Sequence, residues 1–489
     1  MPKSVLSKSA EGSIYNIAAS GLTIVFGFVR SVILMRLLGP EEFGIVTLAL
    51  FFTVFVAPVS SLGIDLALIQ RQNPPAEAFS THFILRLGLS SIVLLVGILL
   101  SPLLRWIYAD QVMVVNIFLV LLAINLLTAF FSTHSVILRR NMNFKAMASL
   151  NLLSSLAMTI TAPVLAYLGA GVWSLVAEQA VGPVVRGVGL WGVLKLWQPS
   201  WRFDWREAKS SLGFGKDVFS AQVSGILLDR FDDFWIGTAL GSVMLGYYSR
   251  AYEIAQYPQR ILATPVTNVF YSTYTAVQEN KEDLSKAFFR SSSFLIRVGF
   301  LMTAILMSTA SEITVVLFGE TWLPIVPVFR LMLIYIVFDP LYNNLSYLII
   351  AVGRPNWLSQ VRIIQLVLFV ISVIGFAFGW GINGVAMAAN LMMMTGTIIL
   401  IIYSKNFVDF SIRQMFLWPS IALVTAIFIS YLSVVNLQWA HVWWALVVKT
   451  STTLVAYGVI LYCAERKVIH EYGNQFLKPM WGSLRARVF

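Results

Sequence analysis

The chain is poor in the residues that build disulfides and metal centres. It has one cysteine, Cys463, and four histidines among 489 residues. A single cysteine excludes an internal disulfide and any cysteine-based metal cluster. The histidines lie in different segments without the spacing of a metal site, so we expect no bound metal. They are His82, His134, His441 and His470.

Acidic residues are also scarce, and no long polar region interrupts the chain. It carries 23 Asp and Glu against 34 Lys and Arg. No polar segment approaches the size of a nucleotide-binding domain, and no loop carries a catalytic constellation, so we do not expect an enzyme. Gly213–Asp217 resembles a phosphate loop only superficially, because it lacks the Walker spacing and a Ser or Thr after Lys216.

Apolar runs fill the chain instead. Hydrophobic residues make up 58% of it, and the mean hydropathy is +0.79. Runs of about 20 residues, enough to cross a ~30 Å hydrocarbon core, recur along the whole length. We predict an all-α membrane protein with about fourteen spans, over residues 13–37, 43–69, 82–104, 112–137, 146–168, 171–195, 212–240, 244–275, 288–317, 324–351, 357–378, 381–404, 413–436 and 441–463.

The basic residues predict the orientation of these spans. If the N-terminus is cytoplasmic, only Arg36 and Arg105 fall in external turns. Nine basic residues fall within spans, and the other 23 are cytoplasmic. This split satisfies the positive-inside rule and places both termini in the cytoplasm. The net charge of +11 then reflects topology and contact with anionic membrane lipids. We expect no nucleic-acid partner, which would need a solvent-exposed basic surface.

An internal repeat divides the chain. Three motifs recur in the same order at spacings of 202, 207 and 210 residues: Leu38-Gly39 with Gly44 recurs as Leu240-Gly241 with Gly246, Pro58-Val59-Ser60 as Pro265-Val266-Thr267, and Gly169-Ala170-Gly171 as Gly379-Trp380-Gly381. We predict two pseudo-symmetric six-helix lobes and an appended helix pair. The domains are an N-lobe (1–196), a cytoplasmic linker (197–211), a C-lobe (212–404), spans 13 and 14 (405–463) and a basic cytoplasmic tail (464–489).

Because each predicted lobe has an even number of spans, the two lobes run parallel and a substrate cavity is expected between them. Alternating access by rocking of the lobes follows as a hypothesis. The linker mixes Trp and Arg, which suits a membrane-surface helix as well as an ordinary loop.

Arginines within spans are the candidates for the substrate site. A charge inside the membrane usually faces a partner or an aqueous cavity. The guanidinium group stays charged and binds phosphate with a planar fork, so a cationic cavity implies an anionic cargo. The candidate site residues are Arg30, Arg186, Arg230, Arg250, Arg260, Arg297 and Tyr257. The helical period aligns Arg250, Glu253, Tyr257 and Arg260 on one face.

Two alternatives stay open for these charges. The arginines can pair with acids such as Glu178, Asp232 or Asp65 instead of facing a cavity. Others lie nearer span ends, where snorkelling to the interface is expected: Arg86, Arg250, Arg330 and Lys449. Buried carboxylates are candidates for coupling transport to H⁺ or Na⁺, with no other cofactor: Asp339, Glu178, Asp232 and Glu253.

Several motifs resemble one known family. They are Arg36-Leu-Leu-Gly39-Pro40-Glu41-Glu42-Phe43-Gly44, Asp232–Gly237 with Leu240-Gly241, Leu245–Ile254 with Pro258, Leu317–Trp322 and Gly353–Asn356. Together they span most of residues 10–405. The chain resembles the Wzx-type polysaccharide flippases of the multidrug/oligosaccharidyl-lipid/polysaccharide superfamily, in the colanic-acid-exporter-like subgroup.

This resemblance implies a bacterial inner-membrane protein. Its activity would be to move an undecaprenyl-diphosphate-linked oligosaccharide repeat from the cytoplasmic to the periplasmic leaflet. Polysaccharide polymerase and chain-length machinery are the implied partners, and a monomer is the simplest model. The resemblance implies cavity arginines in spans 1, 2 and 8, as in related flippases. Arg30 and Arg260 are the matching positions in spans 1 and 8. Span 2 of this chain has no arginine in its interior and so departs from that pattern. The alternative is a cation-coupled exporter of drugs or metabolites from the same superfamily.

Overall fold

The computed structural model describes residues 3–435 and 441–472. Nearly all of these residues are helical, and the described part contains no β-strand. Within the described residues, ten helices are long and apolar enough to cross a membrane, which makes the chain a multi-pass membrane protein. The basic tail predicted over 464–489 lies mostly outside the described residues.

The helices group into two compact units. Unit 1 comprises Met1–Arg250 and Val370–Val385, and unit 2 comprises Ala251–Phe369 and Ala386–Phe489. The division falls inside helices near residues 250, 370 and 385, whereas the sequence places the lobe boundary at 197–211. The two-lobe organisation therefore stays a prediction.

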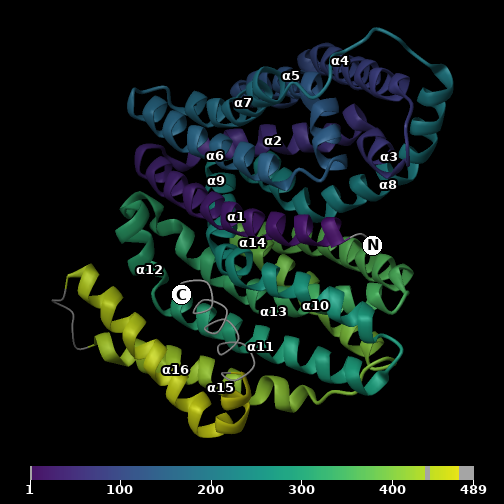
Figure 1. Cartoon of the computed structure of the whole chain (residues 1–489). Coiled ribbons are helices and arrows are strands. Elements are labelled where there is room, and N and C mark those ends of the chain that lie inside the picture. Colours follow the sequence, from purple (N-terminus) through teal and green to yellow (C-terminus); the bar gives the residue numbers. More distant parts are fainter. Residues whose placement is uncertain (1–2, 436–440, 473–489) are drawn as a thin grey trace, which may run out of the picture. The chain divides into compact units, whose positions relative to one another are not determined.

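Unit 1 is built mainly from long helices that follow one another along the chain (Figure 1). Helix α1 packs along α6, α6 along α7, and α4 along α5. The elements are α1 (Lys3–Leu37), α2 (Pro40–Ser61), α3 (Ile64–Gln70), α4 (Ala76–Ile107), η1 (Ala109–Gln111), α5 (Val112–Arg140), α6 (Phe144–Tyr167), α7 (Val172–Val188), η2 (Gly189–Leu194), α8 (Trp205–Trp235), η3 (Ile236–Leu240) and most of α9 (Ser242–Ala255).

Two predicted segments of unit 1 differ from a simple helix. The span predicted over 43–69 is interrupted after α2, because Leu62 and Gly63 have φ angles of 40° and 68°. The linker is extended up to Asp204, and helix α8 begins only at Trp205. The carboxylate of Asp204 caps α8 by accepting a hydrogen bond from the backbone N–H of Arg206 at 2.7 Å. Residues 197–204 of the linker are thus a loop, and residues 205–211 form the start of α8.

Unit 2 has a core of fully buried side chains that includes Tyr274, Phe288 and Leu345. Helices α15 and α16, in yellow-green and yellow, form a hairpin that packs against α11 (Figure 1). The elements are η4 (Gln259–Ala263), α10 (Thr264–Val277), α11 (Lys281–Ser308), α12 (Ala310–Ile313), η5 (Thr314–Phe318), η6 (Glu320–Ile325), α13 (Val326–Ala351), both end parts of α14 (Pro355–Ser404), α15 (Ile412–Val435) and α16 (Val442–Tyr472).

Helix α14 consists of two helices joined end to end. It is 50 residues long, and Gly381 within it has φ 55° and ψ −136°, a conformation that favours glycine. The break lies where the sequence places the end of the span over 357–378 and the start of the span over 381–404.

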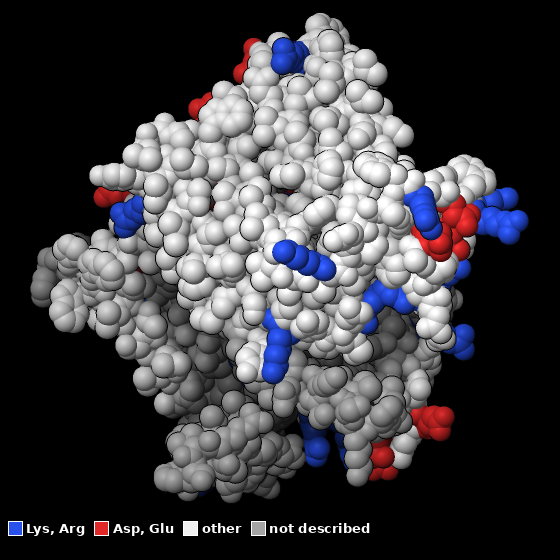
Figure 2. Space-filling model, turned by 45° about the horizontal axis from the view of Figure 1, so that its top comes forward, with Lys and Arg blue, Asp and Glu red and all other residues white. Residues whose placement is uncertain are grey.

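Much of the molecular surface is apolar, as a lipid environment requires. Figure 2 shows a face on which most of the described surface is neither acidic nor basic. Large hydrophobic side chains project from the helices, and Leu99 and Phe378 are 78% and 82% exposed. We infer that lipid tails cover these surfaces.

Candidate functional site

Helices α1, α6 and α7 of unit 1 line an open cavity of about 570 Å³. Two of the predicted arginines line it, Arg30 from α1 and Arg186 from α7. The remaining polar lining consists of hydroxyl and amide side chains, namely Ser20, Thr23, Asn151, Ser154 and Ser155.

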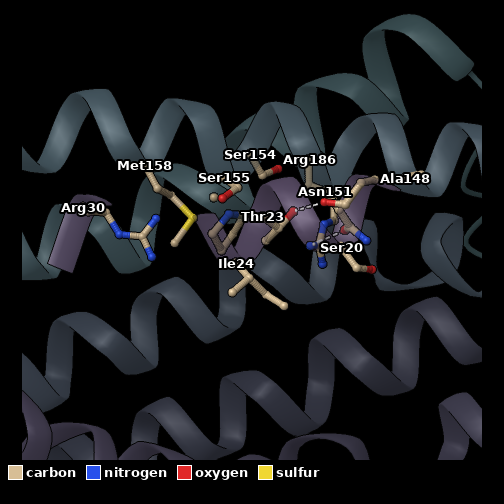
Figure 3. Close-up of a pocket in the computed structure, with 13 residues that line it drawn as sticks. Ser20, Thr23, Ile24, Arg30, Ala148, Asn151, Ser154, Ser155, Met158 and Arg186 are labelled. Carbon is tan, nitrogen blue, oxygen red and sulfur yellow. Dashed lines mark hydrogen bonds between the residues drawn. The ribbon is translucent and has the colours of Figure 1, made fainter. Parts of the chain in front are cut away.

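The helical period explains why these residues share one wall. Ser20, Thr23 and Arg30 are separated by three and seven residues, which places them on the same face of α1. A rise of 1.5 Å per residue makes this polar row about 15 Å long. Figure 3 shows Arg30 at one end of the labelled side chains, and Arg186 with Asn151 at the other. The cavity therefore has a cationic group toward each end and hydroxyl groups between them.

Arg30 is only partly neutralised by the protein. Its Nη2 lies 3.0 Å from Oε1 of Glu178 on α7, and the two side chains are 14% and 15% exposed. Among the described residues, Nη1 of Arg30 is buried and has no hydrogen-bond partner. A buried donor left without an acceptor is costly, so this nitrogen is suited to bind an incoming anion.

Arg186 is oriented by a neutral group. Its Nη2 donates to Oδ1 of Asn151 at 2.8 Å, which fixes the guanidinium without balancing its charge. The hydroxyl of Ser154 is buried nearby without a hydrogen-bond partner in the described part of the chain. The lining thus presents two guanidinium groups and unsatisfied hydrogen-bonding capacity, which suits a phosphate or pyrophosphate attached to a polar body.

Other predicted site residues of unit 1 do not line this cavity. Arg230 on α8 donates to Oδ2 of Asp233 at 2.9 Å, and its side chain is 48% exposed. Asp232 is 8% exposed and accepts a hydrogen bond from the hydroxyl of Tyr248 at 2.6 Å. The guanidinium of Arg250 lies over the ring of Phe43, 4.7 Å from its centroid.

The helix predicted over the span 244–275 is not continuous. Helix α9 ends at Ala255, and the π-helix η4 begins at Gln259. Arg260 is exposed, donates to Oε1 of Gln256 at 2.7 Å and lies 5.9 Å from the ring centroid of Tyr257. Tyr257 is 9% exposed, and Glu253 is half-buried.

In unit 2, Arg297 pairs with an acidic side chain, which is the alternative to a cavity-facing arginine, and Asp339 contacts an amide side chain. Arg297 donates from Nε and Nη2 to the two carboxylate oxygens of Glu465, both at 2.8 Å. Its Nη1 donates to the carbonyl oxygen of Ser293 at 2.8 Å. Asp339 is 7% exposed, and its Oδ2 accepts a hydrogen bond from the amide of Asn343 at 3.0 Å.

The snorkelling prediction is wrong for Arg86 and Lys449, which are each 8% exposed. Arg86 donates to the carbonyl oxygen of Ser60 at 2.6 Å. The Nζ of Lys449 lies 2.6 Å from Oε1 of Glu312. Acceptors inside the protein satisfy both charges, so neither side chain extends to the membrane surface.

One buried cluster was missed by the sequence analysis. His82 on α4 is 4% exposed, and its Nε2 lies 2.9 Å from Oδ1 of Asp65 on α3. Its Nδ1 lies 3.0 Å from the hydroxyl of Thr133 on α5. Arg86 approaches the same carboxylate at 3.4 Å. His82 and Arg86 are four residues apart on α4, but Asp65 and Thr133 come from other helices, so the sequence spacing does not identify the cluster.

Solved structures with the same fold are membrane transporters. The lipid II flippase MurJ in an inward closed conformation superposes with a TM-score of 0.74, at 16% identity, over 94% of this chain and 100% of that chain. A multidrug resistance MATE family transporter in an inward-facing conformation gives a TM-score of 0.60, at 18% identity, over 80% of this chain and 97% of that chain. At these identities the likeness shows the fold.

Sequence relatives are proteins of polysaccharide biosynthesis. The chain is 23% identical to the lipopolysaccharide biosynthesis protein WzxC of Escherichia coli, over 81% of this chain and 80% of that protein. It is 28% identical to the succinoglycan biosynthesis transport protein ExoT of Rhizobium meliloti, over 62% of this chain and 61% of that protein. A family model described as "Polysaccharide biosynthesis protein" matches residues 33–327. The chain therefore belongs to this polysaccharide biosynthesis protein family, in agreement with the resemblance of its motifs to the Wzx-type flippases.

Proposed function

We propose that this protein is a flippase for undecaprenyl-diphosphate-linked oligosaccharide repeat units. It moves them from the cytoplasmic to the periplasmic leaflet of the bacterial inner membrane by alternating access, and it makes and breaks no covalent bond. The observation that carries the proposal is the cavity lined by Arg30 and Arg186 in a chain of this family. The named relatives act in lipopolysaccharide and succinoglycan biosynthesis, which supports a lipid-linked sugar as cargo.

The proposal includes fourteen spans with both termini in the cytoplasm. Ten helices meet the length and apolarity of a span. The further spans are supplied by α7 with η2, by α8 with η3, by α9 to α10, and by the second half of α14. The cavity lined by Arg30 and Arg186 lies within the predicted N-lobe. It differs from the cavity that the sequence predicts between two six-helix lobes, which stays a prediction.

The cavity chemistry suits the cargo. A pyrophosphate carries about two negative charges at neutral pH, and it must leave the hydrated headgroup layer during flipping. Arg30 and Arg186 replace part of its hydration with charge-assisted hydrogen bonds, each contributing about 1.5–3 kcal/mol. The hydroxyl row on α1 and α6 faces the sugar, and the polyprenyl tail stays in the bilayer.

Export in a flippase-deleted strain tests this assignment. A radiolabelled-sugar assay reports the leaflet on which the lipid-linked repeat accumulates. We expect the wild-type gene to restore periplasmic exposure, and Arg30→Gln and Arg186→Gln to leave the repeat on the cytoplasmic side. Arg105→Gln is the matched control, because Arg105 donates to Asn116 at 3.0 Å as Arg186 does to Asn151 but does not line the cavity.

Direct binding provides a second test. Farnesyl diphosphate serves as a short-chain probe for the detergent-purified protein. Loss of one arginine contact should weaken binding by about 10- to 100-fold, the equivalent of ~1.5–3 kcal/mol. If the wild type, Arg30→Gln and Arg186→Gln bind farnesyl diphosphate with equal affinity, the cavity is not the diphosphate-binding site. Normal periplasmic exposure of the repeat in the deletion strain would favour the cation-coupled exporter instead.

A further inference from the structure

Helices α2 and α9 cross at a pair of glycines within unit 1. A Cβ atom added to Gly44 would overlap the carbonyl oxygen of Ser242. One added to Gly246 would overlap the carbonyl oxygen of Pro40. Glycine at both positions therefore allows the two backbones to touch, as at small-residue crossings of other membrane helices.

The crossing is reciprocal. Gly246 is 202 residues after Gly44, and Ser242 is 202 residues after Pro40, so each glycine contact is the repeat equivalent of the other. This is the spacing of the first repeated motif in the sequence. Thr47 and Ser249 are also 202 residues apart, and their hydroxyl oxygens lie 3.4 Å from each other. A residue that contacts its own repeat equivalent lies on the local twofold axis. The two repeats thus meet on this axis through α2 and α9.

The crossing lies near one end of both helices. Pro40 and Ser242 begin α2 and α9, directly after turns that the positive-inside rule places outside the membrane. Gly44 lies about 6 Å along α2 from its start. The hydroxyl of Tyr108, which lies between α4 and η1, is 2.7 Å from that of Thr238 in η3. The external ends of the two repeats are therefore held together in this structure.

The contacts at the crossing are of a kind that can part. Backbone packing at the glycines consists of many individually weak van der Waals contacts. The Thr47–Ser249 hydroxyl pair is long for a hydrogen bond between oxygens. Gly241, with φ 89°, lies between the π-helix η3 and the start of α9. This position can absorb a change in the direction of α9, as hinge residues do.

We propose that the Gly44–Gly246 crossing is the external gate of the transport path, and that α9 leaves α2 there in each cycle to release cargo. Glycine allows complete closure, and a β-carbon at either position acts as a wedge. The identity of the cargo rests on the proposed function. The separation of α9 from α2 is a movement that can be measured without cargo.

A reversible cross-link tests whether the gate opens during transport. Thr47→Cys and Ser249→Cys are introduced together with Cys463→Ser, which removes the native thiol. After oxidation, peptide mass mapping quantifies the disulfide, and the leaflet assay measures export. We expect export to fall to the level of the deletion strain when the disulfide forms, and to recover on reduction. Full export by completely cross-linked protein would overturn the proposal, because the crossing would then be stationary.

A matched pair controls for the cross-link itself. Ser308 on α11 and Thr453 on α16 also face each other through hydroxyl groups, 3.0 Å apart, and both belong to unit 2. A disulfide between Ser308→Cys and Thr453→Cys, again with Cys463→Ser, should leave export unchanged. Equal loss of export in both cross-linked proteins would overturn the specific role of the α2–α9 crossing.

Labelling from outside tests the gate without cargo. Thr47 is 7% exposed, so Thr47→Cys should react slowly with a membrane-impermeant maleimide. Adding Gly246→Ala should wedge the crossing open and raise the labelling rate at least tenfold in protein that elutes as a single species. An unchanged rate would overturn the wedge. A rate increase on adding Gly246→Ala, together with failure of the protein without this substitution to flip lipid-linked sugar, would refute the proposed function while leaving the gate intact.

Discussion

Replacing Arg297 by methionine should destabilise the protein more than replacing Arg297 and Glu465 together. The two side chains form a double hydrogen bond at 2.8 Å between α11 and α16, and each is 8% exposed. Arg297→Met leaves the carboxylate of Glu465 buried without its partner, which costs about 3–5 kcal/mol. The double variant Arg297→Met with Glu465→Leu removes both charges, so its free energy of unfolding should be close to that of the wild type.

Thermal unfolding of the detergent-purified protein, followed by tryptophan fluorescence, measures this difference. A unit of 150–250 residues shifts its Tm by about 2–4 °C per kcal/mol, so the single variant should melt at least ~6 °C lower. All variants are heated at the same rate, because membrane proteins often unfold irreversibly. The exposed pair Lys286–Glu282, with side chains 57% and 77% exposed, is the control. Its removal should leave the Tm unchanged within error.

The reasoning would be refuted by two results. Equal Tm values for the wild type and Arg297→Met would show that the buried carboxylate is satisfied by water or by another group. A double variant that melts as low as the single variant would show that packing, rather than the unpaired charge, dominates the loss.

Three further outcomes are expected. Lys449→Met should lower the Tm by several degrees because it leaves the carboxylate of Glu312 without its partner. Adding Glu312→Gln should restore part of the lost stability. No recovery of the Tm would contradict the pairing of the two side chains. Asp339→Asn should abolish the response of transport to a proton or sodium gradient if this carboxylate couples the two, and an undiminished response to ionophores would exclude it. Asp65→Asn should destabilise the protein through the buried cluster around His82, and an unchanged Tm would show that this cluster contributes little.

Much of the fold is accessible from the sequence because helix length and apolarity decide it. The long helices lie where apolar runs were found, and even the break at Gly381 coincides with a glycine motif of the repeat. The interruption of α9 was not predicted, since a π-helix leaves no clear mark on hydrophobic periodicity.

The candidate site could be predicted only in part. Arg30 and Arg186 were chosen because an arginine within a span needs a partner or an aqueous cavity, and the structure places both at one cavity. Which acid meets which arginine depends on tertiary packing. Arg297 meets Glu465 from the far end of the chain, and Arg86 meets Asp65 across two helices. Whether any of these arginines binds cargo stays a prediction.

The ion pairs of α16 have a consequence for biogenesis. Lys449 and Glu465 both lie in the last helix, and their partners Glu312 and Arg297 are synthesised long before them. Lys449 lies well inside the span, and its charge alone opposes partition from the translocon into lipid, by about 2.5–3.5 kcal/mol at a helix centre, whereas Glu465 lies at the end of the span and adds less. Stable insertion of the last helix therefore depends on α11 and α12 already being in place. A nascent chain misfolded around residues 297–312 would hold its final helix poorly in the bilayer and so present a target for membrane quality-control proteases.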